Sequence, residues 1–116
     1  MSLWVLLLAC GGLSGAPSAP DGDPRAAMAA RPLVTTQHGA CRMACRDVTE
    51  AEVVALLHDG RWVPERTRHD GECPSHAVEG RSADGQQLRV VYAACADETR
   101  VVTAIDLGED HDCSCP

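Results

Sequence analysis

The sequence predicts an α+β domain in which two short N-terminal helices pack on a four-stranded antiparallel meander stapled by disulfides. Two segments with helical capping and periodicity come first, within residues 35–58, and four strand-like segments joined by short turns follow them. The 116-residue chain carries seven cysteines but no Phe, one Tyr and two Trp. A small core without large aromatic side chains supplies little stability, so covalent staples are expected.

The first helix is expected to start at Thr35 or Thr36, either of which can cap it, and to end near Arg46. Gly39 weakens this helix without ending it. The helix contains most of the stretch HGACRMACRDV, residues 38–48, which brings together a histidine, two arginines and two cysteines. Most of the residues that could carry chemistry therefore lie on one element.

The second helix is expected to begin after Thr49 and to end near His58. Residues 49–52 read Thr-Glu-Ala-Glu and match a capping box, in which the Thr49 hydroxyl and the Glu52 carboxylate accept from backbone amides at the helix start. Gly60 is expected to supply the left-handed turn that ends the helix. The apolar residues recur at the i, i+3, i+4 spacing of one buried stripe, namely Val53, Leu56 and Leu57.

The four strands are expected over residues 61–67, 76–82, 87–95 and 99–107. Pro64 has no backbone N–H, which suits an edge position for the first of them. The sequence Ala-Asp-Gly at residues 83–85 indicates a hairpin between the second and third strands. Ser82 is then expected to face Gln86. The same register continued outward places Cys73 opposite Cys95, close enough to form a disulfide.

Four further cysteines of the expected domain fall into two local pairs. Cys41 and Cys45 lie one helical turn apart, where a bridge between them would be strained. Cys113 and Cys115 are too close in sequence to join comfortably. Each local pair is therefore expected to bond to the other, which would pin the C-terminal tail to the first helix. Spacing leaves open which tail cysteine meets Cys45.

Residues 1–10 resemble a bacterial export signal. Residues 3–9 form an uncharged apolar run that is too short to span a bilayer, and the run ends in a Leu-Leu-Ala-Cys sequence that resembles a lipobox. Residues 11–32 are rich in Gly, Ala, Ser and Pro and are expected to form a flexible tether, so that the folded domain occupies residues 33–116. We therefore expect a periplasmic domain held at the outer membrane by a lipid on Cys10.

The first helix also suggests an enzymatic alternative. His38, Arg42 and Arg46 recur at i, i+4 and i+8, and in an RNase-like enzyme they could place a general acid or base beside two phosphate-binding cations. The favoured interpretation is a solvated helix edge whose arginines pair with nearby carboxylates. The net charge of −7 would repel a phosphate backbone, so nucleic-acid binding is not expected.

A zinc-binding domain is the second alternative. His38, Cys41 and Cys45 lie at i, i+3 and i+7, and Cys113 or Cys115 could complete a tetrahedral set of ligands. None of these spacings is the C-x2-C of many structural zinc sites, and exported proteins tend to oxidise their thiols. No cofactor is therefore expected. The acidic residues before the last cysteines are expected to form a solvated turn, and they are Asp106, Glu109, Asp110 and Asp112.

Several motifs resemble the domain-of-unknown-function family 4258 over about residues 36–107. They are His38-x3-Arg42-Met43-x2-Arg46, Val48-Thr49 with Glu52-Val53, Leu56-Leu57-x2-Gly60, Ala77-Val78-Glu79-Gly80-Arg81 and Asp84-Gly85-Gln86-x2-Arg89-Val90-Val91. The tail, with Cys113 and Cys115, resembles a cysteine-bearing branch of that family. The resemblance implies an uncharacterised activity, and its helix-then-strand layout resembles small RNase toxins of the RelE and BrnT type at the level of fold only.

Taken together, these observations predict an exported envelope domain with a binding or structural role. Its partner is expected to be a protein or a small molecule, and catalysis is not the favoured interpretation.

Overall fold

The computed structural model describes residues 22–115 of the chain. The expected export signal, including Cys10, and the expected tether as far as residue 21 lie outside these described residues. No helix of the described part is long and apolar enough to cross a membrane. The elements of this part follow one another as α3 (Arg25–Ala29), β1 (Leu33–Thr35), α4 (Gln37–Cys45), α5 (Glu50–Asp59), β2 (Arg61–Arg68), β3 (Ser75–Arg81), β4 (Gln87–Ala94) and β5 (Thr99–Asp106).

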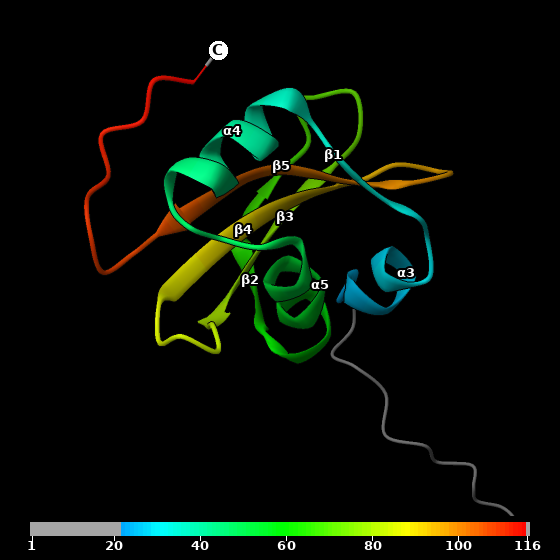
Figure 1. Cartoon of the computed structure of the whole chain (residues 1–116). Helices are drawn as coiled ribbons and strands as arrows, with labels where there is room; N and C mark the ends of the chain where they lie inside the picture. Colours follow the sequence, from blue (N-terminus) through cyan, green and yellow to red (C-terminus); the bar gives the residue numbers. More distant parts are fainter. Residues whose placement is uncertain (1–21, 116) are drawn as a thin grey trace, which may run out of the picture.

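The strands form one five-stranded sheet in the order β1-β5-β4-β3-β2 (Figure 1). β2 to β5 make the expected antiparallel meander. The prediction of a purely antiparallel four-stranded sheet is nevertheless wrong, because β1 adds a fifth strand that runs parallel to β5, with Leu33 beside Thr99 and Thr35 beside Val101. β1 has only three residues, too few to show the alternating pattern that identifies a strand in a sequence.

The β3–β4 hairpin has the predicted register. The Ser82 amide donates to the Gln86 carbonyl at 2.9 Å, and the ladder continues from this turn to Ser75 opposite Ala93. Pro64 lies on β2, which forms an edge of the sheet as expected. The hairpin turn therefore fixes which residues of β3 and β4 face one another.

α3, α4 and α5 all cover one face of this sheet (Figure 1). Thr36 caps α4 by accepting from the Gly39 amide at 2.9 Å, and Thr49 and Glu52 form the predicted capping box of α5. The core lies between the two layers. It consists of Met28, Met43, Val48, Val53, Leu56 and Leu57 from the helical layer and Val78, Leu88, Val90, Tyr92, Val101 and Ala104 from the sheet.

Tyr92, the one tyrosine of the chain, ties α5 to the centre of the sheet. Its hydroxyl donates to the backbone carbonyl of Val53 at 2.6 Å, and its side chain is fully buried. Burial raises the pKa of the Tyr92 phenol above its usual value of 10. This side chain therefore stays neutral and serves as a buried donor within the core.

The folded part begins earlier than the sequence predicts. Residues 11–32 are expected to be a flexible tether, but within the described residues 22–32 they form α3, and Met28 is fully buried in the core. The Met28 carbonyl accepts from the buried Thr99 hydroxyl at 2.8 Å. The Arg25 guanidinium also donates to the Gly60 carbonyl at the end of α5. The boundary at residue 33 is therefore wrong, because this short helix docks through Met28 and through polar contacts to β5 and α5.

Candidate functional site

The tail is fastened to α4 by two disulfides. Cys41 joins Cys115 and Cys45 joins Cys113, with Cα–Cα distances of 5.8 and 5.9 Å. This is the cross-pairing of local pairs that the sequence favours, and it settles the connectivity that spacing leaves open. The four sulfurs are consumed as disulfides, so they carry no thiolate for a metal. The alternative zinc site of His38 with these cysteines is therefore not formed in this structure.

The third disulfide closes the open end of the β3–β4 hairpin. Cys73 joins Cys95 with a Cα–Cα distance of 5.1 Å, as the hairpin register predicts. The Ala94 amide donates to the Pro74 carbonyl at 2.7 Å, so the ladder does extend past the proline. Three disulfides in a domain of this size indicate an oxidising location outside the cytoplasm.

The structure divides the predicted His38, Arg42 and Arg46 stripe. Arg42 Nε donates to His38 Nε2 at 3.4 Å, so these two side chains do lie together. The Arg46 guanidinium instead donates to the Ala104 carbonyl of β5 at 2.6 Å. Burial, together with the charge of Arg42, lowers the pKa of Arg46, and the carboxylate of Asp106 opposes this effect. Arg46 therefore links α4 to the sheet and is not placed beside His38 as a phosphate-binding cation.

A polar cluster at the end of β5 was not expected from the sequence. Asp106, Glu109 and His111, called the tail cluster below, place their ligand-type atoms within 4.8 Å of one another. The Asp106 side chain is only 4% exposed, so the prediction of a wholly solvated acidic turn is wrong at this residue. The hydrogen bond from the Gly108 amide lowers the pKa of the Asp106 carboxyl, although burial acts in the opposite direction. Hydrogen bonds from His111 and Gln86 lower this pKa further.

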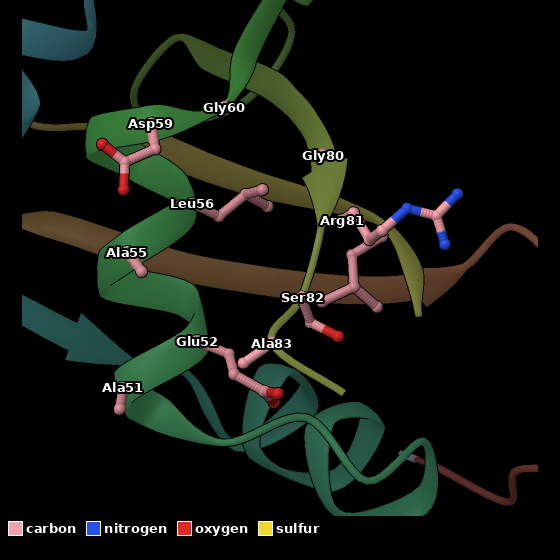
Figure 2. Close-up of a pocket in the computed structure, with 11 residues that line it drawn as sticks. Ala51, Glu52, Ala55, Leu56, Asp59, Gly60, Gly80, Arg81, Ser82 and Ala83 are labelled. Carbon is pink, nitrogen blue, oxygen red and sulfur yellow. The ribbon is translucent and has the colours of Figure 1, made fainter. Parts of the chain in front are cut away.

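A cleft with mostly apolar walls lies between α5 and the end of β3. Its volume is about 260 Å³. Figure 2 shows Leu56 extending from α5 toward Gly80, and Glu52 extending toward Ser82 and Ala83, while the Arg81 guanidinium points away from the helix. The walls are mostly apolar or small, and they include Ala51, Ala55, Leu56, Gly60, Gly80 and Leu88.

Two glycines shape this cleft. A Cβ at Gly80 would lie 2.6 Å from Leu56 Cδ1, and a Cβ at Gly60 would lie 2.6 Å from Val78 Cγ1. Gly60 is the stricter position, because a Cβ there would also lie 2.6 Å from the backbone oxygen of Leu56, whereas the end of the Leu56 side chain could move away from a Cβ at Gly80. Gly60 has an extended backbone with φ −79°, so the left-handed turn expected there is wrong. The sequence shows these residues only as parts of two motifs, because the cleft depends on how α5 crosses the sheet.

The fold and the disulfides define a small disulfide-linked α+β domain built on a five-stranded mixed sheet. The chain belongs to the family described as "Domain of unknown function (DUF4258)", which matches residues 35–106. The resemblance read from the sequence motifs is thus confirmed. α3 and the tail with Cys113 and Cys115 lie outside the matched residues. Neither curated proteins nor solved structures give a match to this chain.

Proposed function

We propose that this chain is an exported domain of the bacterial cell envelope that is anchored through a lipid on Cys10 and binds a protein partner. The observation that carries the proposal is the set of three disulfides, which links α4 to the tail and closes the central hairpin. Such bridges persist in the periplasm and are rare in the cytosol. The lipobox-like sequence that ends at Cys10 supplies the attachment point.

The cleft between α5 and β3 is the proposed contact for that partner. Its volume of about 260 Å³ falls just below the range of ordinary small-molecule pockets, so it suits one anchoring side chain of a protein better than a complete ligand. The net charge of −7 and the Glu52 carboxylate at the cleft favour a basic segment around that anchor. The partner chemistry is therefore an apolar side chain flanked by cations.

The envelope location is tested by intact mass spectrometry of the protein recovered from membranes after expression of the full chain. We expect a chain that starts at Cys10, because the lipidated cysteine of a lipobox becomes the mature N-terminus. Its mass should lack six thiol hydrogens, since six cysteines are bridged, and should include a diacylglyceryl group. Cys10→Ala is the matched control, which should keep the three disulfides and leave the membrane fraction. Protein found in the cytosol with every thiol free to alkylation would overturn the proposal.

The cleft is tested by placing a photo-crosslinking amino acid at Ala55 in intact cells. Ala55 lines the cleft, whereas Val54 is 41% exposed on the same helix and does not line it, which makes position 54 the control. A discrete adduct from position 55 that is absent from position 54 is the expected result. Identical adducts from both positions, or none from either, would remove the cleft from the proposal.

A further inference from the structure

The end of β3 extends beyond the strand that pairs with it. β2 begins to pair with β3 at Arg61, which lies opposite Glu79, and among the described residues that ladder includes neither Gly80 nor Arg81. Both of these residues instead line the cleft that separates β3 from α5 (Figure 2). β3 therefore presents a short edge of the sheet to the proposed partner cleft.

The backbone groups of Arg81 point toward this open edge. Arg81 lies opposite Gln87 on β4, and the Gln87 carbonyl accepts from the Leu107 amide at 2.7 Å, on the β5 side of β4. Gln87 therefore directs its backbone groups away from β3. In an antiparallel ladder the residue opposite such a position also directs its backbone groups away from the pair. The N–H and C=O of Arg81 consequently face the side on which β2 lies farther along the sheet.

The side chains at the end of β3 alternate between the two faces of the sheet. Figure 2 shows the Arg81 guanidinium pointing away from α5, whereas Gly80 and Ser82 line the cleft. Residues directly opposite one another on paired strands project to the same face. If a further strand paired with Arg81, its residue beside Ser82 would therefore project into the cleft.

Building on the partner contact argued above, we propose that the partner enters the cleft as an extended segment that adds a strand beside Arg81, antiparallel to β3. The N–H and C=O of Arg81 bond to the backbone of this segment. One apolar side chain of the segment lies beside Ser82 and packs on Leu56. The carboxylates of Glu52 and Asp59 belong to the α5 wall and favour basic residues next to that anchor.

Substitution of Arg81 tests the added strand. Arg81→Pro removes the N–H that faces the cleft, and this N–H is not part of the β3–β4 ladder, so the sheet keeps its hydrogen bonds. Arg81→Ala is the matched control, because it removes the side chain and keeps the amide. With the photo-crosslinking amino acid at Ala55 in intact cells, the adduct should persist in Arg81→Ala and fall at least about tenfold in Arg81→Pro.

The outcomes distinguish the added strand from the cleft contact itself. An undiminished adduct in Arg81→Pro would overturn the added strand and leave the cleft contact in place. Equal loss in Arg81→Ala and Arg81→Pro would also overturn it, because the side chain would then account for the effect. Absence of the adduct when residue 81 is still arginine would overturn the cleft contact and the added strand together.

Amide hydrogen exchange of the purified full chain gives a readout that needs no substitution. The Arg81 amide should exchange at least about tenfold faster than the Gly80 amide, because Gly80 lies opposite Leu88 at a hydrogen-bonded position of the β3–β4 ladder. Equal protection of the two amides would show that the edge at Arg81 is already paired within the chain, and the added strand would then have no place to bind.

Discussion

His76 is a histidine whose surroundings disfavour the protonated form. It is 8% exposed, its ring meets Trp62 edge-on with centroids 6.3 Å apart, and its Nδ1 lies 3.4 Å from the Thr67 hydroxyl. Burial lowers the pKa of His76 below 6.5, the charge of His69 adds to this, and Asp23 opposes it. The ring therefore binds a proton more weakly in the folded chain than in the unfolded chain.

This difference predicts a pH dependence of stability. The contribution of His76 is fully present above its unfolded pKa of 6.5 and is lost as the pH falls through the lower folded pKa. Urea unfolding at about pH 7.5 and about pH 5 should show a larger loss of stability in the parent protein than in His76→Gln. Comparing the two proteins removes the pH effects that they share. Equal losses would contradict the assignment.

Gly39 sets how closely α4 approaches the sheet. A Cβ at this position would overlap the carbonyl oxygen of Val101 on β5, which is backbone and cannot turn aside. Gly39→Ala should therefore lower the free energy of unfolding by about 1–3 kcal/mol, even though alanine favours a helix by about 1 kcal/mol.

Gly71 is the control for that substitution. A Cβ at Gly71 would meet only the Cys73 carbonyl oxygen at 3.7 Å, which is an ordinary contact. Gly71→Ala should change stability by less than about 0.5 kcal/mol in the same denaturant titration. If Gly39→Ala were neutral or stabilising, α4 would have to sit farther from β5 than the structure shows.

Among the elements, α3 has one buried side chain, that of Met28. Met28 is fully buried, and the remaining residues of this five-residue helix are alanines and an arginine that give little apolar area. Met28→Ala should cost about 2–5 kcal/mol in urea unfolding, whereas Met28→Leu, which conserves volume, should cost less than about 1.5 kcal/mol. Equal and negligible effects would show that α3 is not part of the folded unit.

The elements differ in how far the sequence reveals them. α5 and the β3–β4 hairpin follow from local chemistry, namely the Thr49 capping box and the turn at residues 83–85, so they could be predicted. β1 and α3 could not be predicted. β1 has only three residues and α3 has only one large apolar residue, so neither shows a periodic pattern in the sequence. These two elements form only because β5 and the helical layer offer them partners.

The candidate sites also differ in whether local sequence predicts them. Cys73 and Cys95 face one another because a hairpin fixes their register, and this register can be worked out from the sequence. The burial of Asp106 and its contact with His111 depend on how two disulfides turn the tail back over α4, which no local pattern encodes. Long-range covalent geometry therefore limits what the sequence predicts about the tail cluster.

At the scale of the whole molecule, stability depends on the redox state. One sheet face carries the helical core, and residues 107–115, which form no helix or strand, are linked covalently to α4. The two tail bridges span sequence separations of 74 and 68, whereas the hairpin bridge spans 22. By the chain-entropy model, closing a loop of the longer size stabilises a fold by about 4 kcal/mol.

The two long loops are nested, and this makes their contributions non-additive. When Cys45–Cys113 is intact, the Cys41–Cys115 bridge closes a further loop of only a few residues, which should stabilise the fold by about 2–3 kcal/mol. The same stabilisation is expected from Cys45–Cys113 when Cys41–Cys115 is intact. The variant Cys41→Ala with Cys115→Ala should therefore remain folded, as should Cys45→Ala with Cys113→Ala. The variant that lacks all four cysteines also loses the long closure, so its loss should exceed the sum of the two single-bridge losses.

Urea unfolding under non-reducing conditions measures these losses, and the hairpin bridge provides the comparison. Cys73–Cys95 lies inside both tail loops, but it does not touch the short segments 41–45 and 113–115 that the second tail bridge closes. Removing it together with one tail bridge should therefore give losses that add to within about 0.5 kcal/mol. The combined tail variant should be strongly destabilised or unfolded, since a domain of this kind has only about 5–15 kcal/mol in total. Simple additivity of the two tail bridges would mean that they constrain the unfolded chain independently, which their nested positions do not allow.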